Sequence, residues 1–542
     1  MAPQPISQAD PSPPLLTSRT KRLLLENLKA YAFVAPAMIL LFAFGIFPIL
    51  YAAYVSLFRW RIRQGDFVGL RNYVEAMGDV AYVFFGLVAL GLVFTAASTL
   101  TAALRTARER NLPLHYPLLS LVPAAVIVSG ATLLLLRALT LFAQQETYIL
   151  GNAPLGLALV IGGGIGAWYY NQTQHRRLTT SQFATLPNFV APALTVLASA
   201  GLAIAILYFT YHELLISPRA AVALIRIRYL SFGLGALVAA YFIWTWSMSQ
   251  ASTVKLIGGL VGAIALMAAG VNLVTIWPST RAESDPDFYF SLLATVFYAL
   301  GTVPFQLGIS MILAILLFQN IKGKGVFRVL FFIPYIAPTV ATAGIFEAIF
   351  SIRPSSLANL PFTQWGVNPA GALKWLREAG PAIAKLGEAM GIESMTDITW
   401  GPSLALFVVI LFNIWVFVGY DTVIFLAGLG NIPNTLYEAA KIDGAGRWAL
   451  FRYITLPLLS PTTYFLSVIS IIGTFKAFNH IWVLRDPAAQ GTIDTASIYF
   501  FQTFFRGQRF GYATAMAIVL FVIILVMTII QNRVAQKKVF YG

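Results

Sequence analysis

Long apolar runs separated by short polar turns dominate the chain from residue 30 onward. A membrane-spanning helix needs roughly 20 predominantly apolar residues, and by that measure the pattern predicts about 12 transmembrane helices. The predicted fold class is therefore an all-α polytopic membrane protein. The predicted spans are 31–57, 81–104, 116–143, 148–170, 188–211, 229–248, 255–277, 287–318, 327–350, 402–428, 462–484 and 512–532.

A strongly polar island at 436–461 interrupts the apolar pattern in the C-terminal half. Just before and inside it, Thr435 and Glu438 have the spacing of a capping box, which predicts the start of a helix. Gly444 and Gly446 follow and are expected to end or turn that helix. An apolar stripe then leads into the next span. The island predicts a helix–turn–helix that lies at a membrane surface.

Three short motifs stand in fixed order within this island: Glu-Ala-Ala at 438–440, Asp-Gly-Ala at 443–445 and Ile-Thr-Leu-Pro at 454–457. Together they resemble the cytoplasmic coupling loop of ABC importer permeases. The resemblance implies that the loop at 434–461 docks into a cleft on a separate ATPase subunit, where the glutamate pairs with a basic residue. The residues implied for ATPase coupling are Glu438, Ala439, Ala440, Asp443, Gly444 and Pro457. The local alternative is that Glu438 only caps its own helix.

Composition supports the membrane prediction and narrows the partners. The chain is 58% hydrophobic and only 11% charged, which is typical of a polytopic membrane protein. Its net charge of +15 indicates cytoplasmic loops beside an anionic lipid bilayer, and no nucleic acid partner is expected. The chain has no cysteine, so disulfides, thiolate metal sites and cysteine nucleophiles are excluded.

The chain is predicted to divide into four regions. Residues 1–29 are rich in Pro and Ser and then basic, without the apolar core of a signal peptide, and are expected to form a disordered cytoplasmic tail. Residues 30–77 resemble the first core span and outer turn of sugar-type permeases. In that family the acidic turn found here at 285–288 would follow at once. Residues 78–284 are therefore predicted to be an inserted membrane region of about six helices. Residues 285–542 are predicted to form the permease core, and the span at 30–77 brings the number of core spans to six.

An even number of inserted helices keeps the core in one orientation, with both termini cytoplasmic in a bacterial-type cytoplasmic membrane. The basic stretches at 105–110 and 175–177 then fall inside, as the positive-inside rule requires. The arginines at 59–63 and 219–228 fall outside and conflict with that rule. Two glycine pairs have the spacing of close helix packing, namely Gly162 with Gly166 and Gly258 with Gly262.

Polar residues inside an apolar span are the first candidates for solute contact. In the predicted span at 462–484, Gly473, Lys476 and His480 recur at helical spacing and are expected to share one face. Aromatic rings suit the C–H faces of a sugar, and amides and imidazole suit its hydroxyls. The candidate substrate-path residues are Asn413, Trp415, Tyr420, Gly473, Phe475, Lys476, Asn479 and His480.

The segment at 473–484 is similar to the solute-lining helix of maltose-type carbohydrate importers. That family often has a neutral amide where Lys476 stands, so the implied solute is a sugar or oligosaccharide, with a phosphorylated or acidic compound as the alternative. The structural alternative for each polar residue is a hydrogen bond across helices. None of the four histidines has a second at ligand spacing, so no metal site is predicted.

The chain contains no GxxxxGK[ST] loop, so it is not expected to bind ATP or to act as an enzyme. The resemblance implies a permease that works by alternating access, with ATP and magnesium on a partner ATPase dimer. It also implies a second permease subunit and an extracytoplasmic solute-binding protein. Two rival functions remain: a self-contained secondary transporter, which needs inverted repeats and intramembrane carboxylates, and a membrane-embedded enzyme, which needs clustered acid, base or metal ligands.

Overall fold

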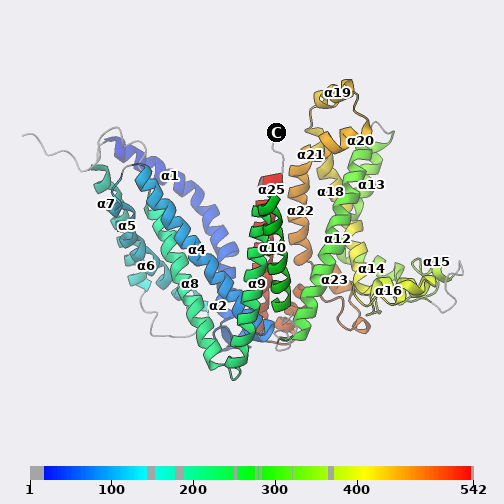
Figure 1. Cartoon of the computed structure of the whole chain (residues 1–542), viewed down its shortest axis with the longest axis horizontal. Coiled ribbons are helices and arrows are strands. Elements are labelled where there is room, and N and C mark those ends of the chain that lie inside the picture. Colours follow the sequence, from blue (N-terminus) through cyan, green and yellow to red (C-terminus); the bar gives the residue numbers. More distant parts are fainter. Residues whose placement is uncertain are drawn as a thin grey trace, which may run out of the picture. The chain divides into compact units, whose positions relative to one another are not determined.

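The computed structural model describes residues 18–110, 112–142, 153–176, 188–248, 253–274, 279, 284–319, 322–363 and 372–538. Nearly all of this chain is helical (Figure 1). It divides into two compact units, Met1–Tyr54 and Val55–Gly542, and each is described by itself.

The first unit consists of one continuous helical path. Helix α1 (Ser18–Leu41) leads through a π-helical turn η1 (Phe42–Ile46) into α2 (Phe47–Val55). Its apolar part, Lys29–Val55, is long enough to span a membrane. The disordered tail predicted for 1–29 is wrong from Ser18 onward, because α1 begins there with residues of high helix propensity such as Leu and Lys. Residues 1–17 lie outside the described residues.

The second unit opens with a short hairpin tied to a helix. Strands β1 (Phe58–Trp60) and β2 (Gln64–Phe67) pair antiparallel, and α3 (Arg71–Met77) follows. The Asn72 amide donates to the carbonyl oxygens of Ser56 at 2.7 Å and Phe58 at 3.0 Å. The Tyr73 hydroxyl lies 2.6 Å from Ser56 Oγ. These bonds satisfy buried backbone oxygens and fix the hairpin on α3.

The region predicted to be an insertion is helical throughout its described parts. Its elements are α4 (Val80–Glu109), α5 (His115–Leu119), α6 (Leu121–Phe142), α7 (Ala153–Arg176), α8 (Val190–Ile216), α9 (Ala220–Met248) and α10 (Thr253–Val274). They supply six candidate spans, the number expected from the sequence. The helix that contains the span expected at 229–248 begins earlier, at Ala220, so the arginines at 226 and 228 lie inside it.

Glycines allow neighbouring helices of this region to pack closely. A Cβ added at Gly130 of α6 would lie 2.7 Å from the carbonyl oxygen of Gly156 of α7. The same test at Gly233 of α9 gives 3.1 Å to the carbonyl oxygen of Gly270 of α10. Such backbone approach is the usual role of small residues between membrane helices.

The two glycine pairs predicted from small-residue spacing are not the contacting ones. A Cβ at Gly162, Gly258 or Gly262 would meet nothing within 4 Å, and at Gly166 only Pro123 Cβ at 3.6 Å. The close contacts belong to their neighbours in sequence: a Cβ at Gly163 would lie 2.6 Å from Ile127, and at Gly259 2.7 Å from Ser247. Successive residues of a helix are rotated by about 100° about its axis. Two glycines can therefore have the right spacing and still face away from the neighbouring helix.

An ion pair accounts for one of the arginines that conflicted with the positive-inside rule. Arg226 Nη1 of α9 lies 3.1 Å from Asp79 Oδ2, directly before α4, and both side chains are mostly buried. Beside them, Tyr82, Leu214 and Ala223 form a small buried cluster. Arg226 is therefore held by a carboxylate of the same chain, which offsets the cost of its position.

The remaining helices form the core that carries the site. Asp285 caps α12 (Pro286–Phe318) by accepting from the backbone N–H of Asp287 at 3.0 Å and Phe288 at 3.3 Å. The elements that follow are α13 (Lys324–Ile336), α14 (Thr339–Ile349), α15 (Leu360–Thr363), α16 (Ala382–Met390), α17 (Glu393–Thr396), α18 (Leu404–Gly430), α22 (Ser460–Phe475), α23 (Asn479–Leu484), a 3₁₀ turn η5 (Pro487–Ala489), α24 (Ala496–Phe505) and α25 (Phe510–Lys538).

Two pairs of neighbouring helices are sharply bent, one within the span predicted at 327–350 and one where the loop at 434–461 leads into α22. Helices α13 and α14 meet at 96°, and the segment Arg447–Leu458 meets α22 at 60°. The span predicted at 327–350, in which Pro334 and Pro338 are the expected kinks, is broken at Pro338. Pro338 precedes α14, and its predecessor, Ala337, takes the extended conformation that a following proline favours, whereas Pro334 lies inside α13. Ten helices of the described chain are long and apolar enough to span a membrane, or up to twelve if each bent pair counts as one span.

Helix α18 is the central element of this core. It packs against α12 and α13 and contributes buried residues to two of the core clusters. A Cβ at Gly419 would lie 1.8 Å from the carbonyl oxygen of Phe331, so only glycine admits α13 at this distance. The two ends of α18 define two ends of the core. Gly430 leads to the polar loop at 434–461, and we call this the α19 end. At the other end Ser403, the N-cap of α18, lines the same cavity as Tyr499 of α24, and we call this the α24 end.

Candidate functional site

The polar loop forms the helix–turn–helix that the sequence predicts. Helix α19 (Asn434–Ile442) is followed by α20 (Arg447–Leu450), a π-helical turn η4 (Phe451–Thr455) and α21 (Leu456–Leu458), and it projects from the core (Figure 1). The predicted capping box is wrong. The N-cap is Pro433, no side chain caps the helix, and Thr435 already lies inside it.

Gly444 makes the turn between the two helices. Its φ of +83° is in the left-handed region, where a residue without Cβ is least strained. The N–H of Ala445 donates to the carbonyl oxygen of Ala440 at 2.9 Å, and the N–H of Gly444 to that of Lys441 at 3.1 Å. These are the two bonds of a Schellman motif, so the turn is firmly defined by backbone alone.

One side of this loop packs on the core and the other is open. Tyr437 packs against the buried cluster of α12, α18 and α22, and its hydroxyl lies 3.1 Å from Thr455 Oγ1. On the open side Glu438 is exposed, and so are Ile442 at 87% and Trp448 at 73% of their full surface. A rigid turn that carries large exposed apolar side chains and a carboxylate is suited to contact another macromolecule.

Farther along α18, a cavity of about 460 Å³ lies among α12, α13, α18, α22 and the start of α23; we call it the inner cavity. It brings together most of the predicted substrate-path residues, namely Asn413, Tyr420, Gly473, Lys476, Asn479 and His480. Two predicted residues do not line it. Trp415 packs against Phe346 at 5.3 Å between ring centroids, and Phe475 is buried in another cluster.

The predicted shared helical face of Gly473, Lys476 and His480 is wrong. Helix α22 ends at Phe475, Lys476 is its C-cap, and a new helix begins at Asn479. The residues reach one cavity because the chain breaks between the two helices. The break leaves Lys476 exposed toward the cavity, with no hydrogen bond or ion pair to its side chain among the described residues.

A buried amide that sequence reasoning missed connects the polar groups of the inner cavity. Gln306 Nε2 of α12 donates to Asp421 Oδ2 at 2.6 Å and to Ser470 Oγ at 3.3 Å. Its Oε1 accepts from Asn413 Nδ2 at 3.2 Å. The signal was present, since Gln306 stands alone as an amide in an otherwise apolar run. The network leaves the cavity wall polar at mid-span and fixes the amide of Asn413.

His480 is held rigidly at the end of this cavity. It is 7% exposed, its Nε2 lies 2.8 Å from the Tyr298 hydroxyl, and its ring stacks on Phe412 at 5.2 Å. No group of three or more His, Asp or Glu side chains that could hold a metal ion is found among the described residues. His480 is thus an anchored hydrogen-bonding group and part of the boundary of the cavity.

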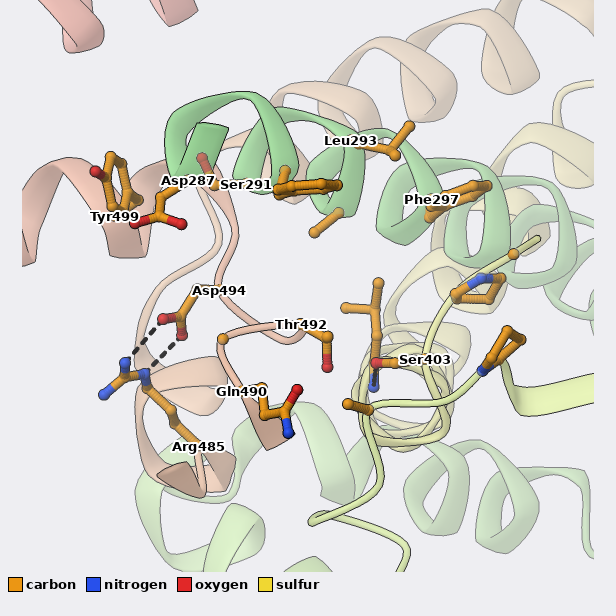
Figure 2. A pocket seen from close by; sticks show the side chains of 18 of the residues that line it. Asp287, Ser291, Leu293, Phe297, Ser403, Arg485, Gln490, Thr492, Asp494 and Tyr499 are labelled. Carbon is orange, nitrogen blue, oxygen red and sulfur yellow. Dashed lines mark hydrogen bonds and ion pairs between the residues drawn. The ribbon is translucent and has the colours of Figure 1, made fainter. Parts of the chain in front are cut away.

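A second and larger cavity, of about 630 Å³, lies at the α24 end; we call it the outer cavity. Figure 2 shows Asp287, Ser291 and Tyr499 on one side of it, with Gln490 and Thr492 opposite. No local pattern in the sequence reveals this site, because its residues come from four segments that are distant in the chain.

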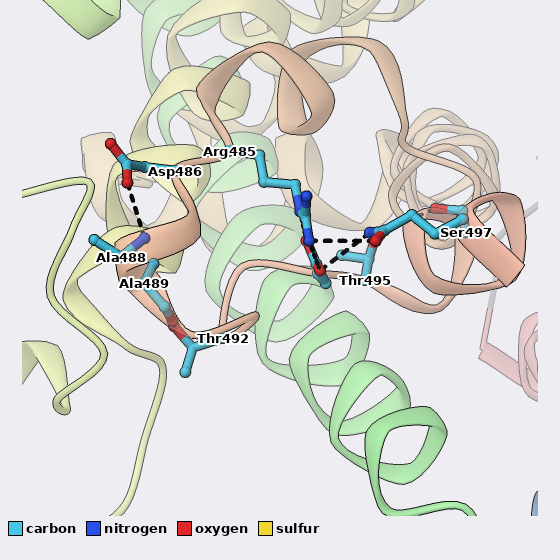
Figure 3. Close-up of polar contacts among 9 residues, drawn as sticks. Arg485, Asp486, Ala488, Ala489, Thr492, Thr495 and Ser497 are labelled. Atoms are coloured by element: carbon cyan, nitrogen blue, oxygen red, sulfur yellow. Dashed lines mark hydrogen bonds and ion pairs between the residues drawn. The ribbon is translucent and has the colours of Figure 1, made fainter. Parts of the chain in front are cut away.

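An ion pair supports the loop that carries Gln490 and Thr492. Arg485 binds both carboxylate oxygens of Asp494, at 2.6 and 2.8 Å (Figure 2). Gln502 Nε2 donates to the same carboxylate at 3.2 Å. The hydrogen bond to Asp494 raises the pKa of Arg485. Within the loop, Asp486 Oδ1 accepts from the N–H of Ala488 at 2.9 Å (Figure 3). The loop is therefore fixed at both ends.

Helices long and apolar enough to span a membrane, two polar cavities between them and a rigid loop projecting from one end are features of membrane permeases. The family model described as "Binding-protein-dependent transport system inner membrane component" matches residues 306–539. The arabinooligosaccharides transport system permease protein AraP of Bacillus subtilis is 32% identical over 256 residues, which cover 47% of this chain and 74% of that protein. The chain belongs to this family and is a permease of an ABC-type importer.

Two further relatives differ in the solute that their names state. The lactose transport system permease protein LacF of Rhizobium radiobacter is 29% identical, over 49% of this chain and 80% of that protein. The sn-glycerol-3-phosphate transport system permease protein UgpA of Agrobacterium fabrum is 28% identical, over 50% of this chain and 83% of that protein.

Proposed function

We propose that this chain is the permease subunit that moves a sugar or oligosaccharide through the inner membrane by alternating access, driven by ATP hydrolysis on a separate ATPase. The observation that carries this proposal is the α19 turn, whose Schellman geometry holds an exposed Glu438 beside exposed apolar side chains. A surface of that kind, at the opposite end of α18 from the outer cavity, can transmit a movement of a partner to the solute path.

The partners follow from this role. The α19 end is proposed to face the cytoplasm and to dock on one subunit of an ABC ATPase dimer, which binds ATP and magnesium. Glu438, Ala439, Ala440, Asp443 and Gly444 are the proposed contact residues, with Pro457 fixing the return into the membrane. A second permease subunit would complete the solute path, and an extracytoplasmic solute-binding protein would deliver solute to the α24 end. Both termini are proposed to be cytoplasmic.

Carbohydrate is favoured as the solute by the chemistry of the inner cavity. The amides of Asn413 and Asn479 and the imidazole of His480 can bind hydroxyls, and the rings of Phe412 and Tyr420 can pack on C–H faces. The names of the arabinooligosaccharide and lactose relatives agree with this choice.

An anionic solute is the second candidate, and Lys476 favours it. The ammonium is exposed toward the inner cavity and has no carboxylate within ion-pair distance among the described residues. The glycerol-3-phosphate relative bears a name of that class.

Reconstitution of the complex in liposomes tests the proposal. Uptake of lactose and of an arabino-oligosaccharide is measured with the binding protein and ATP, together with ATPase activity, for wild type and Glu438→Ala. We expect uptake that needs ATP and that falls about tenfold in Glu438→Ala. Uptake that persists without ATP or any partner chain would instead support a self-contained secondary transporter.

A further inference from the structure

We propose that the outer cavity is a receiving site for neutral carbohydrate, where the solute is held before it reaches the inner cavity. This inference rests on the proposed function, because it takes the α24 end as the side from which solute arrives. It adds a second solute-binding site to the chain. It also implies that this site selects neutral solutes over anionic ones.

The outer cavity has the size and the chemistry of a sugar site. Its volume of about 630 Å³ lies within the range of roughly 300–1,000 Å³ typical of small-molecule sites. Phe290 contributes an aromatic ring to the lining. Phe297 and Tyr499 contribute two more, and Gln490 and Thr492 contribute an amide and a hydroxyl (Figure 2). Rings that pack on C–H faces beside groups that bind hydroxyls are what carbohydrate recognition requires.

The polar side of the cavity is preorganised. Gln490 has a φ of +52° and Gly491 a φ of +75°, so two successive residues take the left-handed conformation and form a tight turn. The Thr492 hydroxyl donates to the carbonyl oxygen of Ala489 at 2.8 Å, which leaves its lone pairs free to accept from a solute. Asp494, only 7% exposed, fixes the end of the turn through Arg485. Backbone that is strained and over-determined in this way is a feature of binding sites.

The charges of the cavity disfavour anions. Arg485 is the cation in its wall, and its guanidinium is already paired with both oxygens of Asp494. The Asp287 carboxylate is exposed to the cavity and has no ion pair among the described residues. The wall therefore carries one uncompensated negative charge, which repels an anionic solute and accepts hydrogen bonds from a neutral sugar.

The two cavities lie in sequence along α23 and are separated by a packed wall. Asn479 and His480 at the start of α23 line the inner cavity, and Arg485 at its end lines the outer one. Tyr298, Ile481 and Leu484 between them are each at most 1% exposed. A solute in the outer cavity is therefore held outside a closed barrier, as a receiving site requires.

The absence of cysteine from the sequence allows a direct test. In the full chain with its partners, Thr492→Cys is labelled with a membrane-impermeant maleimide in the presence of lactose, an arabino-oligosaccharide or glycerol 3-phosphate. The matched control is Ser355→Cys, an exposed position outside the cavity. At ten times its dissociation constant, a neutral sugar that binds the cavity should slow labelling of Thr492→Cys about tenfold. Ser355→Cys should be unaffected, and glycerol 3-phosphate should protect neither.

The charge selection is tested in the same background. Adding Asp287→Lys to Thr492→Cys should let glycerol 3-phosphate protect the thiol. Equal labelling with and without every sugar, while the wild-type complex still takes up sugar with ATP, would overturn the receiving site and leave the proposed function intact. Protection by glycerol 3-phosphate with Asp287 in place would overturn the selection by charge. A complex without any ATP-dependent sugar uptake would contradict the proposed function itself.

Discussion

The Tyr298 hydroxyl of α12 and His480 Nε2 of α23 lie 2.8 Å apart at the wall between two cavities. Tyr298 is fully buried and His480 nearly so. Each polar group is the hydrogen-bond partner of the other. This bond joins the short helix α23 to the long helix α12. The wall is therefore held by a specific hydrogen bond as well as by apolar packing.

Replacing Tyr298 by phenylalanine should destabilise the chain. The change leaves the His480 nitrogen buried without its partner, which costs roughly 1–3 kcal/mol. We expect a lower midpoint of thermal unfolding for the purified complex in detergent. Tyr211→Phe, at a position that is 62% exposed, is the control and should have no effect. An unchanged midpoint for Tyr298→Phe would show that the bond does not stabilise the wall.

Replacing Glu438 by alanine should uncouple transport without harm to the fold. Its side chain is exposed, so we expect unchanged thermal stability and roughly a tenfold loss of uptake, equivalent to about 1.4 kcal/mol of lost contact energy. Thr435→Ala is the matched control on the same helix. Because Thr435 makes no cap, this change should alter neither property. Equal losses of uptake in both variants would argue against a specific role for the carboxylate.

The turn at Gly444 should tolerate no side chain, although space is available. A Cβ at either Gly444 or Gly446 would meet nothing within 4 Å, but only Gly444 has a positive φ. Gly444→Ala should therefore strain the turn by about 1–2 kcal/mol and reduce ATP-dependent uptake. Gly446→Ala should leave uptake near the wild-type level. If the two alanines behave alike in the uptake assay, the geometry of the turn is not what matters.

The close approach of α13 and α18 should make Gly419 irreplaceable. A Cβ there would overlap the Phe331 carbonyl oxygen, and the helices must separate, at a cost of roughly 1–3 kcal/mol. Gly308 of α12 is the control, since a Cβ there would meet nothing within 4 Å. Gly308→Ala should be neutral or slightly stabilising, because alanine has the higher helix propensity. Thermal unfolding of both variants provides the measurement, and equal midpoints would refute the prediction.

Lys476 decides between the two proposed solute classes. Replacing it by glutamine keeps a hydrogen-bonding group of similar length and removes the charge. If the solute is a neutral sugar, uptake should persist within a few-fold; if it is an anion, uptake should fall by about tenfold or more. The measurement is uptake into liposomes with lactose and glycerol 3-phosphate in competition. A loss of lactose uptake in Lys476→Gln would contradict carbohydrate recognition by neutral groups alone.

The sequence was sufficient for the elements that depend on local pattern. Apolar length predicted most of the spans, and the helix-ending glycines predicted the turn at Gly444, because both signals are contained in consecutive residues. The capping box failed for a local reason as well: Pro433 already sets the start of α19, so Thr435 lies too far into the helix to cap it.

The two cavities depend on interruptions of the helices that the hydrophobic periodicity does not reveal. Lys476 and His480 line the same cavity because the chain breaks between α22, which ends at Phe475, and α23, which begins at Asn479, whereas the periodicity predicts one continuous helix. The outer cavity joins Asp287 to Gln490, which are separated by much of the permease core, and no spacing rule links them. Gln306 was visible as a lone amide, but only its contact with Asp421 gives it a role.

The N–H of Asp285 donates to the carbonyl oxygen of Glu75 at 3.1 Å, so the two borders of the region at 78–284 are already hydrogen-bonded to each other. A segment whose ends touch can be gained or lost in one genetic event without moving the rest of the chain. Because these two ends lie side by side, a change in the length of the region between them need not move the helices on either side.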